Sequence, residues 1–314
     1  MHDSDRSELT AAEGGTISGR RPMSGMEFHL FLPQLRMTME AIVERAQAAE
    51  AAGFAGMAFM DHLAPPGAED RPMFDAMTTA AWVAAHTSRL TVGHLVLCDA
   101  FRQPAVLARQ VVTLNHASSG RFELGIGSGS VPRELTRFGV DVEGRRVERL
   151  GETLEVLKLL WSGEPVDYDG RFHRLRGAQQ LPVPTRPIPI LIGGAGPRTM
   201  GLVARHADWW NLPGTDAARL AELREVAGTA RVSLQTIVGY ASDDSGREEV
   251  SATAKRRFGW AASGPALAIG TGFELVEHFS TLHERGVERF YTWFTDFAPV
   301  DTIAGFGAEV IQKI

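Results

Sequence analysis

The feature that most constrains the fold of this chain is a regular alternation between short apolar runs and longer segments with helical periodicity. Runs of consecutive apolar residues are typical of parallel strands buried on both faces. Eight such units in one sheet favour closure of the sheet into a barrel. The predicted fold class is therefore α/β, a (β/α)8 TIM barrel. The predicted strands are residues 28–32, 56–60, 90–97, 122–126, 188–192, 208–211, 232–240 and 288–294.

Residue types with known preferences for helix ends support this alternation. Thr38 is placed to cap the helix expected at 38–52, and Gly53 is placed to end it. Pro104 and Pro197 stand where the first turn of a following helix begins, a position that favours proline. Another helix is predicted by apolar residues that recur at spacings of 3, 4, 3 and 4, namely Val147, Leu150, Leu154, Leu157 and Trp161.

Two connections are longer than one helix requires, at residues 128–187 and 241–287. They predict insertions after strands 4 and 7, near the rim of the barrel, where long loops usually serve function. Residues 1–25 are polar and lack periodicity, so they are interpreted as a disordered N-terminal extension. Residues 26–314 are predicted to form a single barrel domain.

Composition excludes several classes of protein. A formal net charge of −6 argues against a nucleic-acid-binding surface, which is usually basic. No apolar run reaches the roughly 18 residues that a membrane-spanning helix needs. Neither nucleic acid nor a membrane is therefore expected as a partner. The single cysteine, Cys98, allows no internal disulfide and no cysteine-based metal cage, and it favours a cytoplasmic location. No metal site is predicted.

In such a barrel the active site forms at the carboxyl ends of the strands. The second predicted strand ends at Asp61 and His62, a carboxylate beside an imidazole, which suits general acid–base chemistry. The alternative is that Asp61 caps the loop and His62 is an exposed turn residue. The third strand ends at Leu95, Val96 and Cys98, an apolar tip that either presses on a flat ligand or belongs to the core. Cys98 is interpreted as a small buried apolar residue rather than a nucleophile.

Glycine-rich turns follow the fourth and fifth predicted strands. The first has the spacing G-x-G-x-G at residues 125–129, which differs from the G-x-G-x-x-G of a dinucleotide fold. Glycines here let a planar ligand approach the backbone closely. The second turn leads into Pro197 at a helix N-terminus, which favours phosphate, although a tight turn without a ligand is the alternative. The residues expected to contact a ligand are Gly127, Ser128, Gly129, Ser130, Gly193, Gly194, Ala195, Gly196 and Arg198.

Taken together, these stretches resemble the luciferase-like monooxygenase superfamily over about residues 26–314. The segments that carry the resemblance are GRFELGIGSG at 120–129, LKLLWSGEPV at 157–166, PILIGG at 189–194 and ADWWN at 207–211. The chain is most similar to the branch that uses the deazaflavin coenzyme F420. The resemblance implies an oxidoreductase that transfers a hydride between coenzyme F420 and a small organic substrate. It also implies a homodimer formed through the early helices.

The same resemblance implies roles for individual residues. Asp61 and His62 match a pair beside the reacting ring of the coenzyme, with His62 as the catalytic base and Asp61 expected to orient it. Leu95 and Val96 match the site of a non-proline cis peptide bond that forms a bulge behind the ring. The two glycine-rich turns match the segments that contact the tail and the phosphate of the coenzyme.

The chain departs from the sugar-phosphate dehydrogenases of this branch at two places. Ser130 stands where those enzymes carry a glutamate, and Leu63, Ala64 and Pro65 occupy a stretch where a tryptophan is expected. The resemblance therefore implies the coenzyme and not the substrate. Two alternatives remain open at this point: an FMN-dependent monooxygenase of the same fold, and a barrel that binds a phosphorylated ligand without redox chemistry.

Overall fold

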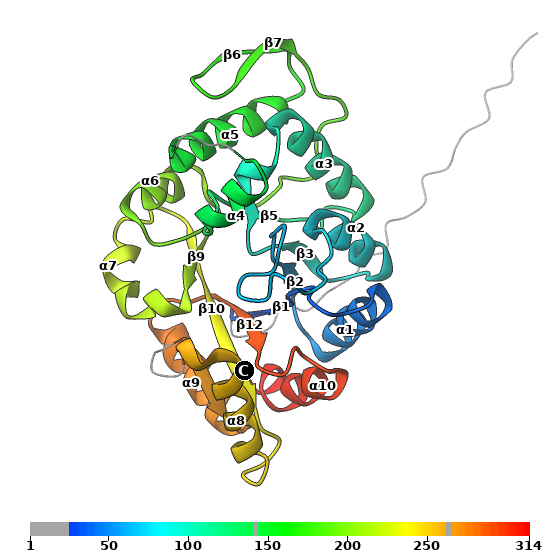
Figure 1. Ribbon diagram of the computed structural model, residues 1–314, viewed down its shortest axis with the longest axis vertical. Helices are drawn as coiled ribbons and strands as arrows, with labels where there is room; N and C mark the ends of the chain where they lie inside the picture. Colours follow the sequence, from blue (N-terminus) through cyan, green and yellow to red (C-terminus); the bar gives the residue numbers. More distant parts are fainter. Residues whose placement is uncertain (1–24, 141–143, 262–265) are drawn as a thin grey trace, which may run out of the picture.

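The computed structural model describes residues 25–140, 144–261 and 266–314. Its strands form a ring that is surrounded by helices (Figure 1). The order of strands is β3-β2-β1-β12-β10-β9-β8-β5-β4, every neighbouring pair is parallel, and β11 pairs with β10 beside this path. The strands are β1 Glu27–Phe31, β2 Gly56–Phe59, β3 Thr91–His94, β4 Leu97–Cys98, β5 Leu124–Gly127, β8 Ile190–Gly193, β9 Trp209–Pro213, β10 Arg231–Tyr240, β11 Leu267–Gly270 and β12 Arg289–Phe294.

The third predicted strand is two strands in the structure. β3 and β4 are separated by the cis peptide bond between Leu95 and Val96, the position that the family resemblance implies. β3 pairs with β2, while β4 pairs with β5. Because β3 and β4 are consecutive in the chain, the two ends of the strand order meet. The parallel bridge between Val92 of β3 and Phe122, two residues before β5, also joins β3 to this side of the sheet. The predicted eight-stranded barrel is therefore confirmed, with its third strand interrupted.

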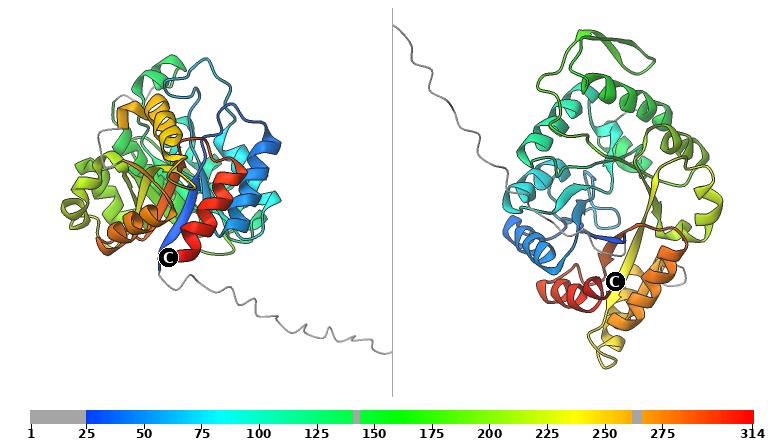
Figure 2. Two further views of the ribbon diagram at one scale, coloured as in Figure 1. Left: turned by 90° about the horizontal axis from the view of Figure 1, so that it is seen from below. Right: turned by 180° about the vertical axis from the view of Figure 1, so that it is seen from behind.

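Helices surround the ring of strands, as the two views along the barrel show (Figure 1 and the right view of Figure 2). They are α1 Met39–Ala52, α2 Ala76–His86, α3 Pro104–Ala117, α4 Pro132–Arg137, α5 Arg146–Leu160, α6 Pro197–His206, α7 Leu220–Arg224, α8 Arg247–Phe258, α9 Gly272–Glu284 and α10 Val300–Glu309, with short 3-10 turns at Asp99–Phe101, Gly214–Arg219, Gly259–Ala261 and Ile311–Lys313.

The predicted helix ends are observed. Thr38 caps α1 by accepting a hydrogen bond from the N–H of Ala41 at 3.2 Å. Gly53 ends the same helix with a φ of 94°, a conformation that favours glycine. Pro104 and Pro197 are the first residues of α3 and α6.

Additional elements occupy both of the long connections. Between β5 and β8 lie α4, α5 and an antiparallel hairpin of β6 Val166–Asp169 and β7 Arg174–Ala178, which lies outside the ring of helices (Figure 1). Between β10 and β12 lie α8, β11 and α9. Of the predicted disordered extension, residues 1–24 lie outside the described part of the chain. The assignment of 26–314 to one domain stays a prediction.

A buried ionic network ties three strands together at the end of the barrel where they begin. The guanidinium of Arg289 donates to Glu123 at 2.7 Å and to Glu27 at 2.9 Å, and it lies 3.6 Å from the ring centroid of Trp209. The hydroxyl of Tyr291 donates to Glu123 at 3.0 Å. Burial of such charges is tolerated because each has several partners. The network joins β1, the residue before β5, and β12, and leaves the opposite end free for chemistry.

Candidate active site

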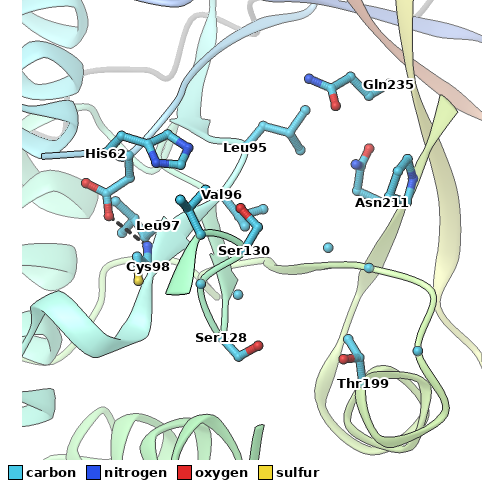
Figure 3. Close-up of a pocket in the computed structure, with 18 of the residues that line it drawn as sticks. His62, Leu95, Val96, Leu97, Cys98, Ser128, Ser130, Thr199, Asn211 and Gln235 are labelled. Carbon is cyan, nitrogen blue, oxygen red and sulfur yellow. Dashed lines mark hydrogen bonds between the residues drawn. The ribbon is translucent and has the colours of Figure 1, made fainter. Parts of the chain in front are cut away.

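A cavity of about 420 Å³ lies at the carboxyl ends of the barrel strands (Figure 3). The segments after β2, β5 and β8 line it, together with the residues around the β3–β4 break and residues of β9 and β10. Parallel strands of a closed sheet all end at the same face, so residues far apart in the sequence meet there. The lining residues are Asp61, His62, Leu95, Val96, Leu97, Cys98, Gly127, Ser128, Gly129, Ser130, Val131, Glu134, Leu135, Gly193, Gly194, Ala195, Gly196, Thr199, Asn211, Pro213 and Gln235.

The structure brings together every candidate residue of the sequence analysis except one. Arg198, one of the residues expected to contact a ligand, does not line the cavity. Its side chain is 73% exposed, and its Nη1 donates to Glu148 at 3.0 Å on the outer surface. Arg198 is the second residue of α6, where the side chain turns away from the glycine-rich turn. Thr199, the next residue, lines the cavity in its place.

His62 is held by a residue that the sequence analysis missed. Its Nδ1 lies 2.8 Å from Oε2 of Glu134, in the first turn of α4. The other carboxylate oxygen of Glu134 accepts hydrogen bonds from the N–H groups of Leu63 at 2.5 Å and Ala64 at 3.1 Å. The expectation that Asp61 orients His62 is corrected by this geometry. The signal for Glu134 in the sequence is weak, because an acidic residue in a first helical turn is common.

Asp61 is engaged elsewhere. Its carboxylate forms a two-point ion pair with Arg102, in which Nη2 donates to Oδ1 at 2.9 Å and Nη1 donates to Oδ2. The N–H of Cys98 also donates to Oδ2 at 2.7 Å (Figure 3). These contacts fix the end of β4 to the end of β2. Asp61 therefore shapes the wall of the cavity by holding Cys98 and, through it, the break between β3 and β4.

The thiol of Cys98 is protonated at neutral pH. Burial, assisted by the charges of Asp61 and Asp99, raises its pKa to about 11. Since the thiolate is the nucleophilic form, Cys98 acts as a packing residue of the cavity wall, as its sequence context indicates.

One wall of the cavity is formed by Val96 and by glycines, so it is apolar and leaves room for a ligand. Val96 packs between Gly127 and Gly193: a Cβ on Gly127 would lie 2.8 Å from Cγ2 of Val96, and one on Gly193 would lie 3.3 Å from Cγ1. A Cβ on Gly196 would meet no atom within 4 Å, so the space above this backbone is open. A flat ring system can therefore rest on Val96 and approach the turn at Gly196 closely.

The opposite wall carries the side-chain amides of Asn211 and Gln235. Asn211 of β9 accepts a hydrogen bond from the hydroxyl of Ser233 at 3.2 Å, and the amide of Gln235 points into the cavity (Figure 3). Such groups suit the polar edge of a heterocyclic ring.

Among the residues that the structure describes, no group of three or more His, Cys, Asp or Glu side chains is arranged to hold a metal ion. No helix in the same described ranges is long and apolar enough to cross a membrane.

A closed parallel barrel with a glycine-lined cavity at the carboxyl ends of its strands is a TIM barrel, the fold class in which active sites form at that end. The family model for luciferase-like monooxygenases matches residues 26–237, and the chain belongs to this family. The resemblance drawn from the sequence is confirmed, and the chain is a luciferase-like oxidoreductase.

Two relatives show how far the similarity in sequence extends. The F420-dependent glucose-6-phosphate dehydrogenase of Mycobacterium avium is 35% identical over 175 residues, which are 53% of this chain and 51% of that enzyme. The chain thus matches about half the length of this relative. An uncharacterized protein of Mycobacterium tuberculosis is 32% identical over 206 residues, 58% of this chain and 71% of that protein.

Solved structures confirm the fold. An F420-dependent secondary alcohol dehydrogenase, solved with an F420-acetone adduct, superposes with a TM-score of 0.79 at 17% identity, covering 91% of this chain and 98% of that one. The monooxygenase RslO1 from Streptomyces bottropensis superposes with a TM-score of 0.77 at 20% identity, covering 92% and 99%.

Proposed function

We propose that the chain binds coenzyme F420 in the cavity between its strand ends and exchanges a hydride between this coenzyme and a small organic substrate. The observation that carries the proposal is the convergence of three features on one cavity: the Val96 wall backed by glycines, the open turn at Gly196, and the imidazole of His62. The F420-dependent relatives in the same family support the choice of coenzyme.

The residues present fit such a coenzyme. Its flat ring system would rest on Leu95 and Val96, and its phosphate would be held at the start of α6. There the N–H groups of Arg198 and Thr199 precede the first hydrogen bond of the helix, which Met200 makes to Gly196 at 2.9 Å. Free N–H groups at this end of a helix attract anions. Arg198 thus contributes its backbone, while its guanidinium points outward.

The chemistry is divided between the coenzyme and the chain. When bound, the coenzyme supplies carbon 5 of its deazaflavin ring as the hydride acceptor or donor. A substrate that is oxidised also loses a proton, and His62 accepts that proton from it. In the reverse direction His62 returns the proton. Positioning of substrate against ring by the cavity walls supplies much of the remaining rate enhancement.

An FMN-dependent monooxygenase is the second candidate, since the family model is named for monooxygenases and RslO1 shares the fold. Parallel titrations separate the two. We expect the fluorescence of coenzyme F420 to be quenched on binding, with a micromolar or lower Kd. FMN should bind at least about 10-fold more weakly, a difference of about 1.4 kcal/mol in binding free energy. Tight binding of FMN together with no binding of F420 would contradict the proposal and favour an FMN-dependent monooxygenase. Binding of neither, with tight binding of a phosphate ester, would support a barrel without redox chemistry.

We also propose that the enzyme is a cytoplasmic homodimer. Met39, Phe74, Ala81 and Trp82 line an apolar groove between α1 and α2, and Trp82 is 48% exposed there. Exposed apolar patches of this kind mark contact surfaces. Sedimentation should give a dimer for the wild type and a monomer for Trp82→Arg. A monomeric wild type would contradict this assembly.

A further inference from the structure

Glu134 is a buried carboxylate whose contacts all converge on the loop that carries His62. It is 8% exposed, although it lies in a short surface helix. One of its oxygens accepts the N–H groups of Leu63 and Ala64, and the other faces Nδ1 of His62. The two carboxylate oxygens thus face three nitrogen atoms: the backbone N of Leu63, the backbone N of Ala64 and Nδ1 of His62. An ionised carboxylate only accepts hydrogen bonds.

This arrangement determines which nitrogen of His62 carries the proton. In a neutral imidazole one nitrogen donates and the other accepts. Since Nδ1 faces a carboxylate oxygen at 2.8 Å, it must donate, and Nε2 is left with its lone pair. Nε2 is then the nitrogen available to a ligand in the cavity that His62 lines. Asp61 cannot impose this state, because its carboxylate is occupied by Arg102 and by the N–H of Cys98.

We propose that Glu134 is the positioning residue that holds His62 as the Nδ1–H tautomer, so that Nε2 is the atom that accepts the proton of the substrate. The inference rests on the proposed function for the identity of the reaction, but the tautomer itself is a property of the protein without coenzyme. Glu134 does this without touching the reacting atoms, by fixing the ring and the loop of Leu63 and Ala64 together.

The substitution Glu134→Gln is expected to change the tautomer of His62. The N–H groups of Leu63 and Ala64 demand an acceptor, so the amide oxygen of the glutamine stays with them. Its NH2 group then faces Nδ1 of His62, and two donors cannot share a hydrogen bond. Nδ1 must become the acceptor, and the proton moves to Nε2. A nearly isosteric change is therefore expected to invert the tautomer and to leave no lone pair facing the substrate.

The test is a two-bond 15N–1H correlation spectrum of the imidazole rings in protein without coenzyme, at about pH 9, where an ordinary imidazole is neutral. His62→Gln identifies the signals of His62. We expect Nε2 to be the pyridine-like nitrogen in the wild type and Nδ1 in Glu134→Gln. The matched control is Glu69→Gln, whose carboxylate is largely exposed and 3.9 Å from Arg137; it should leave the spectrum unchanged.

Kinetics give the second readout. In Glu134→Gln, kcat should fall about 10²-fold, the usual contribution of a positioned base, while the Kd for coenzyme stays within about 2-fold. A wild-type spectrum with the proton on Nε2, or an unchanged tautomer in folded Glu134→Gln, would overturn the inference. If the variant fails to fold, the wild-type spectrum alone decides. If the tautomers behave as expected but no F420 binds, the proposed function fails and the role of Glu134 in setting the tautomer stands.

Discussion

Replacing Gly127 by alanine should push Val96 into the cavity and weaken coenzyme binding. The added Cβ would lie 2.8 Å from Cγ2 of Val96, whereas carbon atoms in contact prefer about 3.5–4.0 Å. Val96 must therefore move by roughly 1 Å. Neither Gly127 nor Gly193 has a positive φ, so the backbone itself accepts alanine. The effect is steric and is directed at the wall that the ring would rest on.

The size of the effect follows from the cost of overpacking, typically about 1–3 kcal/mol. If about 1.4 kcal/mol of this cost appears in binding, the Kd for F420 rises about 10-fold. Gly193→Ala should weaken binding less, about 3-fold, because its Cβ would lie 3.3 Å from Val96 and needs a smaller shift. Gly201→Ala, on α6 with no atom within 4 Å of its Cβ, is the control.

The assay is a fluorescence titration of F420 into the wild type and the three alanine variants, with thermal unfolding to check that each is folded. We expect F420 binding to weaken most in Gly127→Ala, less in Gly193→Ala and not at all in Gly201→Ala. A folded Gly127→Ala that binds F420 as tightly as Gly201→Ala would refute the assignment of Val96 to the wall beneath the ring.

Three further predictions concern single residues. His62→Ala should lower turnover about 10²-fold with the Kd for coenzyme nearly unchanged, as measured by steady-state kinetics and titration; undiminished turnover would remove His62 from proton transfer. Arg198→Ala should leave coenzyme affinity within about 2-fold, because its guanidinium lies outside the cavity and pairs only with exposed Glu148; a large loss would restore its guanidinium as a phosphate contact. Burial raises the pKa of Glu27, but His29 and Arg289 outweigh burial and lower it from 4.5 to about 2. Ionised Glu27 therefore stabilises the fold above about pH 4.5, and this is lost as the pH falls toward 2. Between pH 5 and 3.5 the free energy of unfolding should drop about 1 kcal/mol more in the wild type than in Glu27→Gln, measured with urea; equal drops would contradict the ionic role.

Features encoded locally could be predicted from the sequence. Pro104, Pro197, Thr38 and Gly53 mark helix ends because their backbone preferences act within a few residues. The glycine-rich turns were located for the same reason, and the barrel then brought them together. The hairpin of β6 and β7 was missed because most of its residues are exposed, so it carries no apolar periodicity.

Pairings across long sequence separations could not be predicted. Glu134 meets His62 across 72 residues, and Arg102 meets Asp61 across 41. Each depends on side-chain directions that only the closed barrel fixes. Adjacency in the sequence suggested Asp61 as the partner of His62, but successive residues near a strand end point in different directions. The outward turn of Arg198 has the same origin, since position in the first helical turn says nothing about the side-chain rotamer.

Amide hydrogen exchange with and without F420 shows whether one cavity at the strand ends holds the coenzyme. We expect slower exchange on binding at residues 127–130 and 194–199 and in the loop from His62 to Ala64. A second cavity, between the start of α3 and the β6–β7 hairpin, is lined by Phe101, Gln103, Phe172 and Arg174 and should show no change. Protection confined to that second cavity, or no protection at saturating F420, would contradict binding of the coenzyme between the strand ends.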